Sequence, residues 1–355
     1  MQPGVMYAIG AVLLFGMGTP LAKLLLAQVS PLMLAALLYL GSGLGLLLVR
    51  AVRRERAVLP QGTQWLWLGG AVLAGGVAGP VLLMLGLQNF PAADASLLLN
   101  SEGVLTALLA WFVFKENFDR RIALGMLAIV AGGLVLSWPR DGAPGGGGGG
   151  IFPALLIVAA SLAWAIDNNL TRKVALLDAG FIAMSKGLVA GSVNLGLAWA
   201  TGASLPGAVI VAQAALLGFA SYGASLVLFV LALRHLGTAR TGAYFSIAPF
   251  AGALLAVAIL DEPVRVSLLI GGALMAIGVA LHLTERHSHR HTHEPLRHDH
   301  EHSHADINGV LVDVHHAHSH ATPVAPGATH QHVHQHASLA HTHAHFPDAH
   351  HRHGH

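Results

Sequence analysis

The sequence contains no cysteine, and only 10% of its 355 residues carry a formal charge. The absence of cysteine excludes disulfides, thiolate metal sites and thiol nucleophiles. The low charge excludes an ordinary soluble domain, in which about a quarter of the residues are charged. Aromatic residues are also few, at 6%. What the chain does contain is apolar: 54% of its residues are hydrophobic and its mean hydropathy is +0.62.

The apolar residues recur in blocks of roughly 18–25 residues, the length of helix that crosses about 30 Å of hydrocarbon. The sequence therefore predicts an all-α polytopic membrane protein with ten transmembrane helices. The first block is predicted to be a span and not a cleaved signal peptide, because it lacks a basic leader and is too long. The predicted spans lie near residues 4–26, 31–50, 65–87, 93–114, 121–138, 151–171, 179–200, 208–233, 238–260 and 266–284.

Basic residues in the loops predict the orientation of the chain, because cytoplasmic loops are enriched in Lys and Arg. If the N-terminus is cytoplasmic, the outside loops hold only Arg140 and Arg265, with Lys23 at a helix end. Both termini are therefore predicted to be cytoplasmic. The basic residues of the predicted inside loops are Arg50, Arg53, Arg54, Arg56, Lys115, Arg120, Arg121, Arg172, Lys173, Arg234 and Arg240.

The two halves of the chain resemble each other. The segment ASLLLNSEGVLTALLAWFVFKE (95–116) aligns without gaps to TGAYFSIAPFAGALLAVAILDE (241–262), and both segments end in glutamate. Because each half has an odd number of spans, the second half is predicted to enter the membrane in the opposite orientation. Inverted repeats of this kind are typical of secondary transporters, whose substrate sites lie near the middle of the membrane. The predicted organisation is two five-helix repeats, 1–142 and 151–284, a Gly-rich linker, 143–150, and a tail, 285–355.

The five-plus-five arrangement, a Gly-rich first helix ending in Lys23, and the paired endings ALLAWFVFKE and ALLAVAILDE resemble EamA-type carriers of the drug/metabolite transporter superfamily. The resemblance covers about residues 4–284. It implies a carrier of the bacterial inner membrane that moves small organic solutes, often outward, by alternating access and without a cofactor. It names no substrate, since the family handles amino acids, sugar derivatives, nucleobases and drugs. Glu102-Gly103 stands near the point where the second repeat has Pro249, which indicates a specialised subgroup.

Ionisable residues inside the spans are the candidate substrate and proton pathway. A charged side chain at the bilayer centre costs about 2.5–3.5 kcal/mol on insertion scales, so such residues face water or a partner. We predict that Glu102, Asp167 and Lys186 line one central cavity. One carboxylate would take up and release a proton, while Lys186 would neutralise the other or bind an anionic substrate group. Further candidates for substrate contact are Asn168, Asn169 and Tyr244.

Structural roles compete with this interpretation. Asp167 can pair with Arg172 or Lys173 near the membrane surface. The Lys186 stem can reach the cytoplasmic side by snorkelling. Glu102 can belong to a structural ion pair, and the two asparagines can serve as interhelical hydrogen-bond donors.

The tail differs in composition from the rest of the chain. Of the 25 histidines, only His235 and His282 precede it, and the tail has no apolar periodicity. It is therefore predicted to be disordered when free. Neutral imidazoles suit Zn, Ni, Co or Cu, although a solvated tail without a role and a polycation that charges below about pH 6.5 stay open. The predicted metal ligands are His287, His289, His291, His293, His298, His300, His302, His304, His315, His316, His318, His320, His330, His332, His334 and His336.

Three functions compete at this point. The first is a metabolite or drug carrier that works by efflux and is either proton-coupled or an exchanger, with a metal-binding cytoplasmic tail. The second is an exporter of Ni, Co or Zn that uses the tail as a collector, and the third is a membrane-bound metal sensor or scaffold that transports nothing. An enzyme is not expected, because the spans hold no catalytic motif. The expected partners are a small-molecule substrate, the lipid bilayer and metal ions, with no nucleic acid, in a monomer or homodimer.

Overall fold

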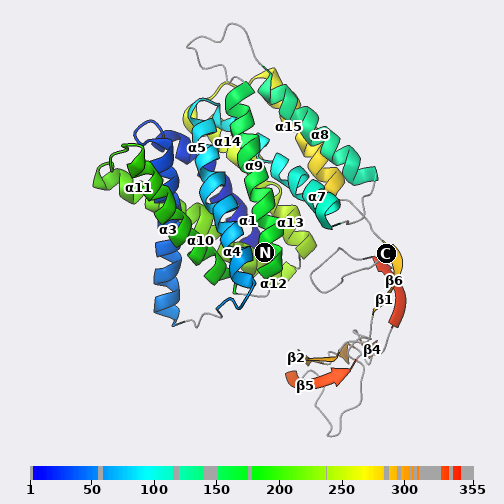
Figure 1. The fold of residues 1–355 in the computed structure, drawn as a ribbon. Helices are drawn as coiled ribbons and strands as arrows, with labels where there is room; N and C mark the ends of the chain where they lie inside the picture. The colour runs from blue at the N-terminus through cyan, green and yellow to red at the C-terminus, as the bar shows by residue number, and fades with distance from the viewer. Residues whose placement is uncertain are drawn as a thin grey trace. The chain divides into compact units, whose positions relative to one another are not determined.

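The computed structural model describes residues 3–54, 59–114, 120–138, 151–174, 178–236, 238–283, 288–293, 297–303, 306–307, 310–311, 329–335 and 339–344. The chain divides into two compact units, Met1–Glu285 and Arg286–His355. The first unit is a bundle of α-helices (Figure 1), as the apolar blocks predict. The predicted linker, 143–150, lies outside the described residues.

Six helices of the described chain are long and apolar enough to cross a membrane, and each coincides with a predicted span: Pro3–Leu25, Pro31–Arg53, Gln64–Gln88, Ile151–Thr171, Gly180–Ala200 and Ala208–Ala232. Three shorter apolar helices fall within further predicted spans: Arg121–Ser137, Ala248–Leu260 and Val266–Leu281. This pattern is that of a polytopic membrane protein.

The first half contains α1 (Pro3–Gly16), α2 (Gly18–Leu25), α3 (Pro31–Arg53), α4 (Gln64–Ala71), the π-helix η1 (Val72–Ala78), α5 (Gly79–Gln88), α6 (Ala92–Leu98), α7 (Ser101–Phe114) and α8 (Arg120–Ser137). The second half contains α9 (Ile151–Thr171), the 3₁₀ turn η2 (Arg172–Val174), α10 (Ala179–Ala200), α11 (Ala208–Gly218), the π-helix η3 (Phe219–Ala224), α12 (Ser225–Leu236), α13 (Thr238–Phe245), α14 (Ala248–Leu260) and α15 (Val266–Leu283).

Two predicted spans are broken at corresponding places in the two halves. The span 93–114 is split into α6 and α7 at Leu99 and Asn100, and the span 238–260 is split into α13 and α14 at Ser246 and Ile247. Both differ from the expectation of one continuous helix. In the first, the Asn100 Nδ2 donates to the Leu97 carbonyl at 2.9 Å, a local hydrogen bond that competes with the helical ladder. In the second, Pro249 lacks a backbone N–H and occupies the first turn of α14.

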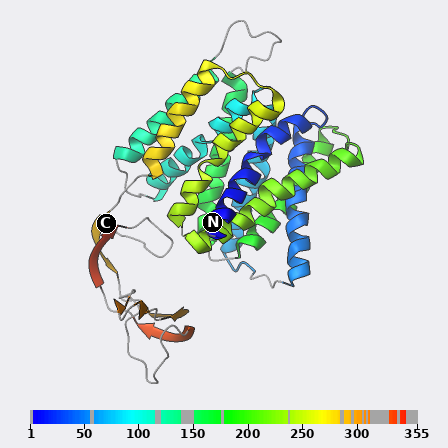
Figure 2. The same cartoon turned by 180° about the vertical axis from the view of Figure 1, so that it is seen from behind.

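Glycines let equivalent helices of the two halves pack closely against each other, and the paired helices run antiparallel. A Cβ added to Gly187 of α10 would lie 2.6 Å from the Gly43 Cα of α3, and Arg50 of α3 meets Asp178 at the start of α10. In the same way, a Cβ on Gly132 of α8 would lie 2.8 Å from the Gly271 carbonyl oxygen of α15. Both views show α8 and α15 side by side (Figures 1 and 2). Any larger side chain at these positions would push the paired backbones apart.

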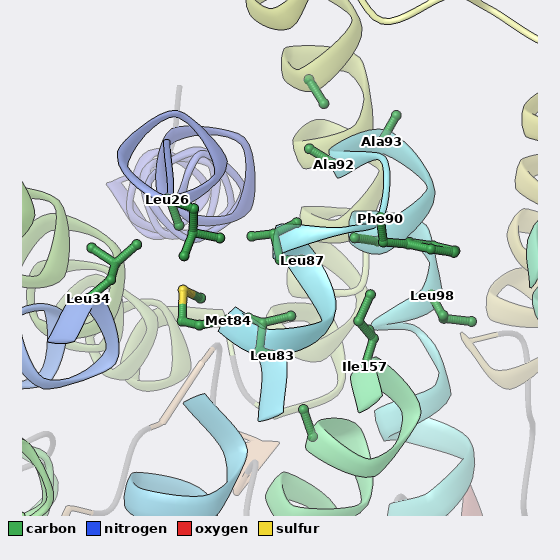
Figure 3. Packing of buried hydrophobic residues seen from close by; sticks show 14 of the residues in the cluster. Leu26, Leu34, Leu83, Met84, Leu87, Phe90, Ala92, Ala93, Leu98 and Ile157 are labelled. Atoms are coloured by element: carbon green, nitrogen blue, oxygen red, sulfur yellow. The ribbon is translucent and has the colours of Figure 1, made fainter. Parts of the chain in front are cut away.

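The main core lies around α5 and reaches both halves. Leu83, Met84 and Leu87 of α5 are buried, and they lie between Leu34 of α3 and Ile157 of α9 (Figure 3). Core packing therefore joins the first helix of the second half to the first half.

The second unit holds short antiparallel strand pairs, and only its backbone is described. The strands are β1 (Ser288–His293) with β6 (Leu339–Ala344), β2 (Arg297–Ser303) with β5 (Thr329–Gln335), and β3 (Asp306–Ile307) with β4 (Val310–Leu311). Their register sets histidine opposite histidine at His289–His343, His291–His341, His298–His334, His300–His332 and His302–His330. The predicted ligands outside the described residues are His287, His304, His315, His316, His318, His320 and His336.

Candidate functional site

The centre of the candidate site is an ion pair between α9 and α10. The Lys186 Nζ donates to both carboxylate oxygens of Asp167 at 2.6 Å. The Thr171 hydroxyl, one helical turn after Asp167, donates to Asp167 Oδ1 at 2.8 Å. The side chains are only 8% exposed for Asp167 and 18% for Lys186. Both charges are therefore held away from lipid, and each neutralises the other.

The π-helix η1 makes room for this ion pair. A Cβ added to Gly75 would overlap the Asp167 carboxylate, so only glycine lets α9 come this close. The Gly75 carbonyl accepts hydrogen bonds from the Tyr39 hydroxyl at 2.8 Å and the Trp164 Nε1 at 2.9 Å. In the next residue, the Gly76 carbonyl accepts one from Asn194 at 3.1 Å. These three side chains satisfy carbonyls that the altered ladder of a π-helix releases, a feature frequent at functional sites.

A second polar group lies on the neighbouring face of α9, where it meets α7. The Asn168 Nδ2 donates to Glu102 Oε1 at 2.8 Å and lies 3.5 Å from the Thr106 hydroxyl. Asn169 donates to the Ala165 carbonyl at 2.9 Å and to the Thr106 carbonyl at 3.4 Å. Glu102 is the second residue of α7, just after the break at Asn100. Its carboxylate is thus held by a neutral amide, and among the described residues it has no salt bridge.

The two groups differ in charge and in exposure. Asp167 and Asn169 are buried, whereas Asn168 is exposed and Glu102 is half-buried. An exposed amide beside a carboxylate within a membrane span is stable only where water reaches it. The Asp167–Lys186 pair is neutral, so the negative charge of the site resides on Glu102. A proton or a cation bound at Glu102 would remove that charge.

The structure thus brings Glu102, Asp167, Asn168, Asn169 and Lys186 together along one stretch of α9. It places Tyr244 elsewhere, in α13, and no contact among the described residues links it to Glu102 or Asp167. Asp167 forms its ion pair with Lys186 of the adjacent helix α10.

The predicted site residues do not include Thr106, Thr171, Gly75 or Tyr39, which contribute to the site. The two threonines follow Glu102 and Asp167 by four residues, which on a helix places them on the same face. That spacing could have identified them. Gly75 and Tyr39 contact the site only because distant helices pack together, and no local pattern indicates this.

Comparison with known proteins agrees with this architecture. The model of the EamA-like transporter family matches residues 2–138 and 151–284. An uncharacterized transporter of Methanothermobacter thermautotrophicus is 28% identical over 290 residues, covering 78% of this chain and 84% of that protein. A probable 4-amino-4-deoxy-L-arabinose-phosphoundecaprenol flippase subunit, ArnE of Erwinia tasmaniensis, is 40% identical over 67 residues, covering 19% of this chain and 61% of its own length.

A crystal structure of another protein, among the solved structures that match, has a similar fold. Its TM-score is 0.58 at 20% identity, and the match covers 79% of this chain and 95% of that one. The apolar helices and the two family matches make this an integral multi-pass membrane protein of the transporter type. The chain belongs to the EamA-like transporter family.

Proposed function

We propose that the protein is a secondary carrier that moves a small organic metabolite or drug out of the cell by alternating access, coupled to a proton at Glu102. The proposal rests on one observation: one carboxylate of the site is paired with a cation and, among the described residues, the other is not. Lys186 neutralises Asp167, whereas Glu102 is held by Asn168 alone among the described contacts. A carboxylate in this environment can bind a proton and exchange it for a passing cation, with the proton released to water.

The proposed architecture is ten spans in two inverted repeats, with both termini in the cytoplasm. The antiparallel contacts of α3 with α10, and of α8 with α15, support an inverted arrangement, because equivalent helices of inverted repeats run in opposite directions. The breaks at Asn100 and Ile247 also support it, since discontinuous helices at corresponding positions are typical of transporter substrate sites.

Transport in proteoliposomes tests the role of Glu102. The probes are labelled amino acids, a sugar, a nucleobase and ethidium, each driven by an imposed pH gradient. We expect Glu102→Gln to abolish gradient-driven movement of the transported probe while leaving its exchange across the membrane intact. Glu102→Asp, which keeps a carboxylate, should retain part of the gradient-driven transport. Equal gradient-driven rates in Glu102→Gln and the unmodified protein would remove Glu102 as the proton site.

We further propose that the cytoplasmic tail binds divalent metal. The strand register supports this, because cross-strand neighbours in an antiparallel pair lie about 4.5–5.5 Å apart at Cβ and the register sets His298–His334 beside His300–His332. Imidazoles so spaced can share one ion, with zinc–nitrogen distances of about 2.0–2.1 Å. The same register favours the second candidate function, an exporter of Ni, Co or Zn. The described intramembrane site offers carboxylate, amide and hydroxyl groups, which suit those metals less well than imidazole.

A further inference from the structure

One end of the helix bundle joins the two halves through charged side chains that the proton site does not use. Glu262, in the loop between α14 and α15, accepts hydrogen bonds from the backbone N–H groups of Ala92 at 2.6 Å and Ala93 at 2.9 Å. Those residues begin α6, and the first N–H groups of a helix have no partner inside the helix. A side chain of the second half therefore holds the start of a broken helix of the first half.

Three further charged side chains lie at the same place. The Arg265 Nη2 donates to Asp94 Oδ2 at 2.8 Å, and the Asp94 side chain is 1% exposed. The Lys23 Nζ donates to three backbone carbonyls just before α6, those of Leu87 at 2.6 Å, Gln88 at 3.0 Å and Phe90 at 3.0 Å. Glu262 also attracts Lys23 electrostatically. We call the four side chains Lys23, Asp94, Glu262 and Arg265 the latch.

Burial differs sharply between the two sides of the helix break at Asn100. On the latch side, all seven residues of α6 are buried. On the opposite side, in α7, a Cβ added to Gly103 would meet no atom within 4 Å, and Asn168, which donates to the neighbouring Glu102, is exposed. On the latch side α6 is thus buried, whereas Gly103 and Asn168 beyond the break are exposed.

We propose that the latch is the closed gate of the carrier, and that the Glu102–Asn168 site is reached in this conformation from the opposite end of the bundle. This inference rests on the proposed carrier function, in which each side opens in turn. Opening at the latch requires separating Glu262 and Arg265 from α6, because each bond joins one half to the other. With the predicted orientation, the latch faces outside and the site is open to the cytoplasm.

Cysteine labelling tests the gate without any substrate, and the chain contains no cysteine of its own. Ser96→Cys places a thiol in α6, where Ser96 is 1% exposed. Gly103→Cys places a thiol in α7, on the exposed side of the helix break. In lipid nanodiscs we expect a bulky charged maleimide to label Cys at 103 readily and Cys at 96 slowly. Glu262→Gln should speed labelling at 96 about tenfold, the change expected from losing about one charge-assisted hydrogen bond.

Matched controls separate gating from unfolding. Asp178→Asn breaks the Arg50–Asp178 ion pair at the opposite end and should leave labelling at 96 unchanged. Arg265→Lys is a milder latch variant, and it should speed labelling at 96 as well if Glu262→Gln does not fold. Two results would contradict the proposed gate. One is fast labelling of the cysteine at position 96 while Glu262 is intact, and the other is a labelling rate at position 96 that neither Glu262→Gln nor Arg265→Lys changes. Neither result depends on the proposed role of Glu102 in transport, because the labelling experiment uses no substrate.

Discussion

At the residue scale, the site depends on how each charge is compensated. Two carboxylates and one ammonium lie together in the described spans, yet only Asp167 is paired with the cation. A buried ion pair adds little stability in itself, but removing one partner leaves an uncompensated charge and costs about 3–5 kcal/mol. The pair therefore leaves Glu102, the proposed proton site, as the carboxylate without a salt bridge among the described residues.

The Asp167–Lys186 pair gives a stability prediction. Lys186→Met should lower the free energy of unfolding by about 3 kcal/mol or more, because the Asp167 carboxylate, whose side chain is 8% exposed, loses its partner. The double variant Asp167→Asn/Lys186→Met should recover most of that loss. Thermal unfolding in detergent measures both. Arg54→Met, at an exposed position at the end of α3, is the control and should change stability by at most about 1 kcal/mol. An unfolding temperature for Lys186→Met equal to that of the unmodified protein would contradict this account.

The residue types of the site could be read from the sequence, but not their partners. Glu102, Asp167 and Lys186 are conspicuous because charge in an apolar block is costly. Which carboxylate Lys186 binds depends on the packing of α9 against α10, and the contact of Tyr39 with Gly75 links residues far apart in the chain. Periodicity carries no information about either.

At the element scale, continuous apolar blocks predict the spans but not their irregularities. The third and eighth predicted spans each contain a π-helix, η1 and η3, and the fourth and ninth are broken. Hydropathy cannot detect either feature, because the residues at these places remain apolar or small. Pro249 is a local signal for the second break, whereas the break at Asn100 depends on a side-chain hydrogen bond.

The glycine of η1 offers a test of this element. Gly75→Ala should destabilise the protein by about 1–3 kcal/mol, because the new Cβ overlaps the Asp167 carboxylate and must displace α9. Gly69→Ala in α4 is the matched control, since a Cβ there meets no atom within 4 Å, and it should be neutral or slightly stabilising. Unfolding in detergent compares the two variants. Equal free energies of unfolding for Gly75→Ala and Gly69→Ala would contradict this prediction, because η1 would then accommodate the added methyl group without loss of stability.

At the scale of the whole molecule, the transport unit and the tail are separate compact units. The family match covers the transport unit and ends at residue 284, before the histidine-rich segment begins. Every contact that builds the candidate site and the latch lies within Met1–Glu285. We therefore expect both to form in a chain that lacks the tail.

Truncation after Glu285 separates the two proposals for metal. We expect the full chain to bind Zn²⁺, Ni²⁺ or Co²⁺ in calorimetric titration and the truncated chain to bind at most a small fraction of that metal, because the histidine pairs of the strand register lie in the tail. In proteoliposomes, neither form should move these ions, while both should move the organic probe equally. Metal flux that survives truncation but fails in Glu102→Gln would instead make metal the cargo of the intramembrane site. Equal metal binding by both forms would place the metal ligands outside the tail.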